Sequence, residues 1–132
     1  MTLEGVPVGQ IITVWSDVRH LIEQGLRNDN YLPRDILAAL VSGDMQLWIM
    51  GRPPAVALVT EIVNYPQRRV CRLIIGAADP GWRTHWLPSL ARVEAWAKAQ
   101  GCQGMEVNYA RKGWARLLKR KPKAVVLEWS LA

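Results

Sequence analysis

The chain contains no phenylalanine, and only two cysteines and two histidines, among its 132 residues. Two cysteines cannot supply the framework of bridges that holds small secreted domains together. Cys71 lies in an apolar run and Cys102 at the end of a helical pattern, so both are predicted to be small buried side chains. His20 and His85 are far apart and lie in no cluster with metal-ligand spacing, so we expect no metal site.

Long apolar runs are also missing. No stretch approaches the ~20 apolar residues that cross a bilayer, and residues 1–7 lack the basic start and apolar core of a signal peptide. We therefore expect a protein without a membrane segment that is cytoplasmic when synthesised. With 50% hydrophobic residues over 132 positions, the chain can bury one core without disulfides or metal, which predicts a single domain over residues 1–132.

Tryptophan takes the place of phenylalanine, with seven Trp against three Tyr. The simpler interpretation is that the indole rings fill the core. The alternative is that some rings lie at the surface and stack on a ligand or partner. Trp82 and Trp86 are the candidates for that role, because they lie beside Gly81, Arg83 and His85 rather than inside an apolar run.

Acidic residues are scarce in the C-terminal part. Residues 1–80 hold 7 Lys/Arg against 8 Asp/Glu, whereas residues 81–132 hold 10 against 3, within a net charge of +6. Such an excess attracts phosphates of a cofactor, nucleic acid or an acidic partner surface, although a solvated helix face explains it equally well. Most of it lies in a basic segment composed of Arg111, Lys112, Arg116, Lys119, Arg120, Lys121 and Lys123.

The N-terminal part predicts two helices followed by an antiparallel meander. Apolar residues recur every three or four positions over 8–26, and a second helix is predicted from Pro33 to Val41, since proline is tolerated in a first turn. The pattern then changes to strands rich in β-branched residues and separated by short turns. These three strands cover residues 45–50, 55–63 and 69–75.

The C-terminal part predicts alternating helices and strands. A helix begins near Thr84 or Leu87 and ends at Gln100, and Gly101 suits the left-handed residue that follows a helix. A strand over 104–109, a basic helix over 112–120 and a final strand over 124–131 complete the order α-α-β-β-β-α-β-α-β. The sheet should be mixed, with helices on both faces, because the last two strands follow helical crossovers.

This order resembles the GNAT superfamily of N-acyltransferases over nearly the whole chain, although an initial strand before the first helix is not evident. Residues 93–107 look like the cofactor-side helix and fifth strand, and residues 111–120 look like the next helix. Small GNAT-like proteins of bacteriophages, including internal virion proteins, have a similar Arg-x-Gly-Trp turn, here Arg111 to Trp114. The resemblance implies an α/β (α+β) fold with a mixed, mainly antiparallel sheet flanked by helices.

The resemblance also implies where acetyl-CoA would bind. Working GNAT enzymes hold the coenzyme A pyrophosphate on backbone N–H groups of a Gln/Arg-x-x-Gly-x-Gly/Ala loop that opens a helix. The corresponding stretch, residues 76–85, departs from that pattern: Pro80 lacks an N–H, and Asp79 places a negative charge where the phosphates should lie. The residues that would form this site are Ile75, Gly76, Gly81, Trp82, Arg83 and His85.

The catalytic side of the resemblance is incomplete. Many GNAT enzymes use a tyrosine on the helix after the fifth strand as general acid, and residues 112–120 contain none. Tyr109, just before that helix, is the remaining candidate acid. Glu61 and Glu106 are candidate bases by strand position, although each is equally well explained as a solvent-facing or ion-paired strand residue.

These features together predict a phage-type GNAT-fold protein that is catalytically degenerate and acts in virion structure or assembly. Its partners would be capsid, portal or other virion proteins, and it would self-associate and become virion-associated. One alternative is an active acyl-CoA N-acyltransferase with an atypical pyrophosphate loop. A second alternative is a nucleic-acid-binding protein that acts through the basic segment, which however lacks aromatic interleaving and any known DNA-reading motif.

Overall fold

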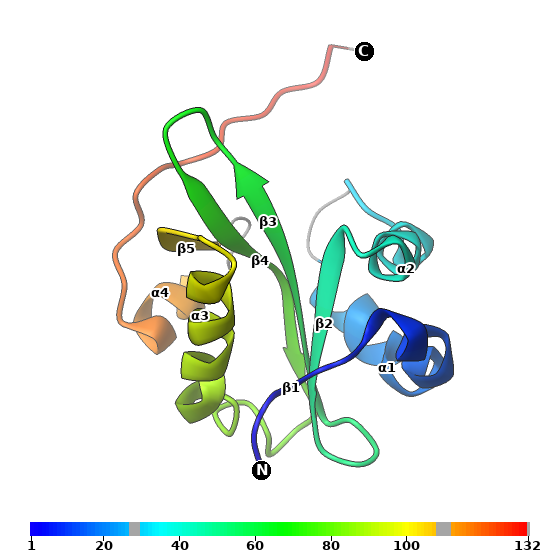
Figure 1. Cartoon of the computed structure of the whole chain (residues 1–132). Helices are drawn as coiled ribbons and strands as arrows, with labels where there is room; N and C mark the ends of the chain where they lie inside the picture. The colour runs from blue at the N-terminus through cyan, green and yellow to red at the C-terminus, as the bar shows by residue number, and fades with distance from the viewer. Residues whose placement is uncertain (27–29, 108–111, 132) are drawn as a thin grey trace.

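The computed structural model describes residues 1–26, 30–107 and 112–131. It contains a sheet of five strands in the order β1-β2-β3-β4-β5 (Figure 1). The strands are β1 Glu4–Gly5, β2 Met45–Met50, β3 Val56–Asn64, β4 Arg69–Ala78 and β5 Gly104–Val107. The α-helices are α1 Ile11–Gly25, α2 Pro33–Ser42, α3 Leu90–Ala99 and α4 Lys112–Leu118, and the 3-10 turns are η1 Val8–Gln10 and η2 Leu87–Ser89.

The sheet is mixed, as the sequence predicts. Strands β1 to β4 form an antiparallel meander, and β5 pairs parallel to β4 after the crossover through α3. The register of β3 and β4 shifts between Val59 and Thr60, because Val59 pairs with Ile75 and Thr60 with Leu73. Strand β4 therefore holds one extra residue, Ile74, at this bulge, which bends a strand and increases its twist.

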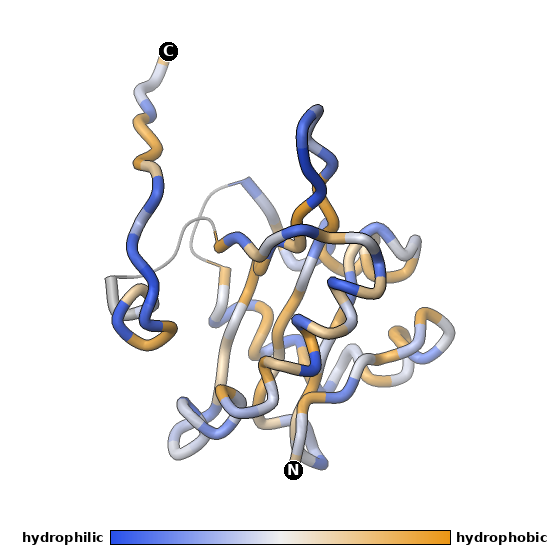
Figure 2. The backbone as a smooth tube through the Cα atoms, turned by 60° about the vertical axis from the view of Figure 1, so that its left-hand side comes forward, coloured by the Kyte–Doolittle hydropathy of each residue, from blue (hydrophilic) through white to orange (hydrophobic). Residues whose placement is uncertain are grey.

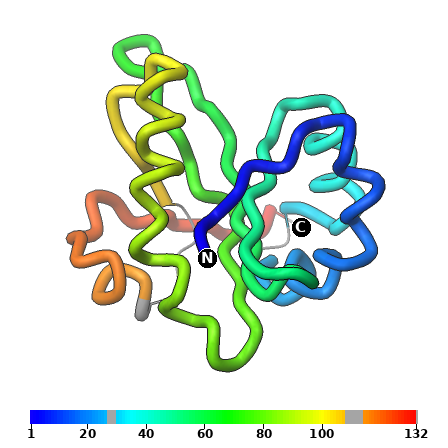
Figure 3. Tube along the Cα trace, turned by 60° about the horizontal axis from the view of Figure 1, so that its bottom comes forward, coloured from blue at the N-terminus to red at the C-terminus, as the bar shows by residue number. Residues whose placement is uncertain are grey.

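Helices cover both faces of the sheet. Figure 3 shows α1 and α2 on one side of the central strands and α3 and α4 on the other. Helix α1 buries Ile11, Val18, Leu21 and Ile22 against the sheet because these residues share one helical face. At Gly25 the helix lies so close to β4 that a Cβ would come within 2.4 Å of the Ile75 side chain.

The hydrophobic core is divided by the sheet into two clusters. On the α1/α2 side, Ala57, Val59 and Ile75 pack with the helices. On the α3 side, Leu58 and Leu73 pack with residues of α3 and α4. Strand β3 is buried on both faces from Val56 to Thr60, which explains its nearly continuous apolar sequence.

Three elements differ from the sequence prediction. A short β1 precedes the helices and was not evident from its two residues, which pair with Ile49 and Trp48 of β2. Strand β4 extends to Ala78 rather than ending at Ile75. Residues 124–131, predicted as the final strand, join none of the strands in the described part of the chain, and their side chains are exposed. Period-2 patterning identifies a sequence able to form a strand but cannot supply its partner.

The tryptophans mostly fill the core. Trp86 is only 4% exposed, so of the two interpretations the core one holds for this residue: it packs in the α3-side cluster because the turn at 83–86 directs it inward. Trp82 is half-buried against the same cluster. The exposed indole is Trp129, at 76%, which lies in the segment of residues 124–131. Trp129, in an apolar stretch of the sequence, is thus exposed, whereas Trp86, among polar residues, is buried.

One buried polar chain crosses β2 and β3. The Trp48 indole N–H donates to Thr60 Oγ1 at 3.1 Å, and Thr60 donates to the Gln46 side-chain oxygen at 2.9 Å. Thr60 is fully buried. Thr60→Val should therefore lower the free energy of unfolding by roughly 1–3 kcal/mol, because it leaves a buried indole N–H without an acceptor.

Chemical denaturation followed by circular dichroism measures this change. Thr60→Ser, which keeps the hydroxyl, is the matched control and should retain most of the stability. A loss in Thr60→Ser with none in Thr60→Val, which keeps the methyl group, would show that the Thr60 methyl group, not its hydrogen bonds, stabilises this part of the sheet.

Candidate functional site

The stretch between β4 and α3 corresponds to the predicted cofactor loop. Residues 79–86 form two successive turns before η2, and Gly81 adopts a left-handed φ of 89°. Arg83 and His85 are exposed, and the His85 ring lies 5.2 Å from that of Trp82. The carboxylate of Asp79 lies 3.3 Å from Nε2 of His20 on α1.

Several backbone donors of this loop are already engaged. The N–H groups of His85, Leu87 and Ser89 already donate to carbonyls within the stretch, at 3.2, 3.3 and 3.0 Å. The position between the last two is Pro88, which has no N–H. A helix start binds a pyrophosphate through unpaired N–H groups, and internal turns occupy several of them here.

The start of α3 is also covered by the beginning of the chain. The Leu3 N–H donates to Ser89 Oγ at 3.1 Å, and the Leu3 side chain is fully buried. Arg92 on the first turn of α3 donates to Thr2 at 2.8 Å. Polar groups at this helix start are therefore engaged by residues of the chain itself.

Gly76, predicted to allow a ligand close to the backbone, instead receives a tryptophan. It lies within β4 opposite Leu58, and a Cβ on it would come within 2.3 Å of the Trp114 ring of α4. Trp114 packs in turn against Trp86, with ring centroids 5.7 Å apart. The absent side chain of Gly76 thus provides the seat for an indole from α4. The neighbouring Ile75 points to the opposite face and is buried against α1.

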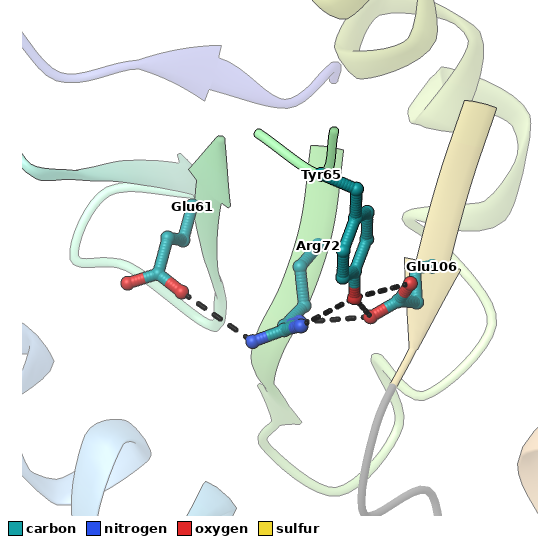
Figure 4. Close-up of polar contacts among 4 residues, drawn as sticks. All are labelled: Glu61, Tyr65, Arg72 and Glu106. Carbon is teal, nitrogen blue, oxygen red and sulfur yellow. Dashed lines mark hydrogen bonds and ion pairs between the residues drawn. The ribbon is translucent and has the colours of Figure 1, made fainter. Parts of the chain in front are cut away.

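Four polar residues meet on the α1/α2 side of the sheet (Figure 4). Glu61, Arg72 and Glu106 occupy directly paired positions of β3, β4 and β5, and Tyr65 reaches over them from the β3–β4 turn. We call these four residues the Arg72 network. The carboxylate candidates predicted from the sequence are thus brought into one row, whereas Tyr109 lies outside the described residues.

Arg72 joins both carboxylates. Its Nε donates to Glu106 at 2.9 Å, its Nη1 lies 3.7 Å from Glu61, and its Nη2 donates to the Tyr65 hydroxyl at 2.9 Å. Tyr65 donates to Glu106 at 3.1 Å. Partial burial opposes the charge of Arg72, but the hydrogen bonds to Glu106 and Tyr65 outweigh it and raise the pKa of the guanidinium above its ordinary value.

Both carboxylates of this row are ion-paired with Arg72. A general base needs a carboxylate oxygen free to reach the proton of the substrate. Here Glu106 already accepts hydrogen bonds from a guanidinium and a phenol, and Glu61 faces the same cation. Sequence reasoning missed Arg72 and Tyr65, because only the strand register places them beside the two glutamates.

The described part of the basic segment is exposed. Arg116 lies in α4, while Lys119 and the residues after it lie beyond the end of that helix. Arg111 lies outside the described residues, and the side chain of Lys112 is not described. The exposed basic side chains are Arg116, Lys119, Arg120, Lys121 and Lys123.

The two cysteines are free thiols. Cys71 is buried, as predicted, whereas Cys102 is half-buried. Burial, with a smaller contribution from the neighbouring Cys102, raises the pKa of Cys71 from 9.0 to about 11, although a hydrogen bond to Thr60 opposes the shift. Cys71 is therefore unsuited to nucleophilic chemistry near neutral pH.

Within the described residues, no helix is long and apolar enough to cross a membrane. No group of three or more His, Cys, Asp or Glu side chains in the same part of the chain is arranged to hold a metal ion.

No protein-family model and no curated protein matches this sequence. Solved structures do match its fold. An aminoglycoside acetyltransferase from an uncultured soil metagenomic sample, in complex with sisomicin, superimposes with a TM-score of 0.73 at 10% identity, over 98% of this chain and 95% of that one. Aminoglycoside 6'-N-acetyltransferase from Acinetobacter haemolyticus gives 0.73 at 14% identity, over 100% and 99%.

A GCN5-related N-acetyltransferase from Ralstonia eutropha JMP134 is similar at a TM-score of 0.70 and 13% identity, over 98% of both chains. These scores over nearly complete chains show that the protein has the GNAT acetyltransferase fold. At such low identity they show the fold alone, and the activity has to be argued from the site.

The Arg72 network predicts a stability effect. Arg72→Gln should lower the free energy of unfolding by roughly 1–3 kcal/mol, because two carboxylates that are only 25% exposed lose their shared cation. The control is Arg19→Gln, which breaks an exposed pair with Glu23 and should cost less than about 0.5 kcal/mol. Equilibrium denaturation measures both, and equal losses would contradict a structural role for the network.

Cys71 predicts a loss of stability at alkaline pH. The folded chain keeps this thiol protonated where the unfolded chain ionises it, so its contribution is complete below about pH 9 and is lost as the pH rises through about 11. Between these limits the wild type should lose about 2 kcal/mol more than Cys71→Ala. Denaturation at several pH values measures the difference. The control variant Cys102→Ala, which keeps the Cys71 thiol, should show most of the wild-type loss of stability. Parallel pH profiles for wild type and Cys71→Ala would contradict the shift.

Proposed function

We propose that this chain is a GNAT-fold binding protein that does not transfer acyl groups and that acts in the structure or assembly of a bacteriophage particle. The observation that carries the first part is the Trp114 ring seated on Gly76. In the resemblance with GNAT enzymes, Gly76 belongs to the stretch where the cofactor approaches the backbone of β4. In this chain the Trp114 side chain of α4 occupies the space beside that glycine.

Two further features support the absence of acyl transfer. The loop before α3 has several of its N–H groups committed to its own turns, and Pro88 removes another donor. The carboxylates of Glu61 and Glu106 are shared by Arg72, and the sequence of α4 contains no tyrosine to protonate a departing thiolate. Both sets of contacts disfavour cofactor binding and acyl transfer, which fits a protein that acts by binding other molecules.

The phage part of the proposal rests on the resemblance of the Arg-x-Gly-Trp turn, residues 111–114, to that of small phage proteins. The exposed basic side chains after α4 provide a surface for an acidic virion component or packaged DNA. Tagged protein produced during infection should remain with purified particles through a density gradient. Recovery only in the particle-free fraction would contradict this role.

The second candidate function is an active acyl-CoA N-acyltransferase. The specific observation in its favour is that Glu61, Glu106 and Tyr65 converge on one face of the sheet, where a substrate amine able to displace Arg72 would meet acid and base groups. One structural neighbour, a predicted acetyltransferase from Clostridium acetobutylicum, was solved with acetyl-CoA. The two functions make opposite predictions for cofactor binding.

A thermal-shift titration with acetyl-CoA distinguishes them. We expect no shift of the wild-type melting temperature at millimolar cofactor, because a ligand raises stability only when it binds the native state. Arg83→Ala should behave in the same way, since this exposed side chain would then have no phosphate to hold. ATP at equal concentration controls for non-specific binding of a polyphosphate to the basic segment.

The opposite result has a clear signature. A saturable shift with acetyl-CoA but not with ATP, weakened by Arg83→Ala, would overturn the proposal and establish cofactor binding. Release of free coenzyme A in the presence of a panel of amines would then test turnover directly.

A further inference from the structure

The stretch that includes α4 and the chain after it carries charge of one sign only. No acidic residue lies between Glu106 and Glu128 in the sequence, and five exposed cations lie inside that interval. None of the five takes part in an ion pair within the described residues. Figure 2 shows this stretch as a mainly hydrophilic length of chain on the outer side of the molecule. The five cations are Arg116, Lys119, Arg120, Lys121 and Lys123.

Helix α4 fixes the place where this charge leaves the body of the protein. Trp114, Leu117 and Leu118 pack in the α3-side cluster, whereas Arg116 on the same helix is exposed. The Trp114 ring also rests on Gly76 of β4, which holds the helix against the sheet. The cations that follow α4 therefore begin at a defined position on the surface.

The end of α4 places a lysine where glycine is the usual residue. The Lys119 N–H donates to the Arg116 carbonyl at 3.2 Å and the Arg120 N–H to the Ala115 carbonyl at 2.9 Å, which are the two bonds of a Schellman helix end. Lys119 takes the left-handed position of this motif, with a φ of 54°. Glycine adopts this conformation without the steric cost that a Cβ adds. A lysine here lowers the stability of the fold, which indicates that its ammonium group has a role outside the fold.

We infer that the basic segment binds the phosphate backbone of double-stranded DNA without reading its sequence. Duplex DNA carries one negative charge per ~1.7 Å of its axis and a layer of condensed counterions, and lysines and arginines that replace these counterions gain affinity. Residues 115–123 contain no Asn or Gln to read adenine and no aromatic side chain on which unpaired bases could stack. The segment is therefore suited to the backbone of a duplex rather than to bases or to single strands.

An acidic protein surface is a less suitable partner for these cations. Lysine is depleted in protein interfaces, and three of the five exposed cations are lysines. Protein partners are selected by charges of both signs in a set arrangement, and this stretch contains no acidic side chain. Uniform positive charge suits a polymer that presents a phosphate at every step. The inference rests on the proposed function for the source of the DNA, and it selects packaged DNA over an acidic virion component.

Fluorescence anisotropy of the full chain with labelled DNA duplexes of two unrelated sequences tests the binding. Five phosphate contacts predict a slope of about −4.5 for the logarithm of the association constant against that of the salt concentration. Affinity for both duplexes should thus fall several hundredfold between about 50 and 200 mM salt. Poly-glutamate should compete about tenfold less well than unlabelled duplex, because it carries fewer charges per unit length. No binding at the lower salt concentration, a flat salt dependence, tighter binding of single-stranded DNA, or equal competition by poly-glutamate would overturn the inference.

The variant Lys119→Gly separates DNA binding from folding. It removes one charge and gives the left-handed position its preferred residue, so the melting temperature should stay equal or rise. The dissociation constant for duplex DNA should rise about five- to tenfold at low salt, and the salt slope should become shallower by about 0.9. Arg34→Gln, on exposed helix α2 at the opposite side of the sheet, removes the same charge and should change the affinity little. Unchanged binding by Lys119→Gly, or an equal loss in Arg34→Gln, would contradict a role for this segment.

Failure of this inference and failure of the proposed function give different results. Protein that stays with purified particles but binds no duplex DNA would overturn the inference alone. Protein that binds duplex DNA and also shows a saturable melting-temperature shift with acetyl-CoA would overturn the proposed function and support the inference.

Discussion

The pairing of β3 with β4 is the constraint on which the other elements depend. The ladder runs from Val56 to Asn64 and from Arg69 to Ala78, and its apolar residues are buried on both faces. One face receives α1 and α2, the other α3 and α4, and the parallel β5 attaches to the far edge of β4. The bulge at Ile74 separates two parts of β4 with different roles. Before it, Arg72 pairs with charged neighbours; after it, Gly76 accepts Trp114.

The same ladder also determines where Trp114 packs. The space beside Gly76 has to be filled if the core is to be closely packed. The Trp114 indole of α4 fills it. Close packing makes such a seat specific, because a void beside β4 would cost the contacts that Trp114 now makes with Gly76 and Trp86. In the proposed function, fold stability and cofactor binding would compete for the space that the Trp114 side chain occupies.

The Arg72 network, on the opposite face of the sheet, illustrates a second competition, between ion pairing and proton transfer. Glu61 and Glu106 stand at sheet positions where a base would be useful, yet the strand register places Arg72 between them. An ion pair that stabilises the fold also occupies the oxygens that a proton transfer would need. The Tyr65 hydroxyl completes the row by bonding to both Arg72 and Glu106.

The sequence by itself determined the elements with strong local signals. The helical stripes of α1 and α2, the turns that separate β2, β3 and β4, and the Gly101 end of α3 all depend on spacing of three to four, on alternation or on glycine, which act within a few residues. Only the tertiary structure decided what depends on contacts across the chain. These are the burial of Trp86, the seat of Trp114, the pairing of Arg72 with two glutamates, and the exposure of residues 124–131. The physical reason is that periodicity specifies which face of an element is apolar, whereas register and packing specify what that face meets.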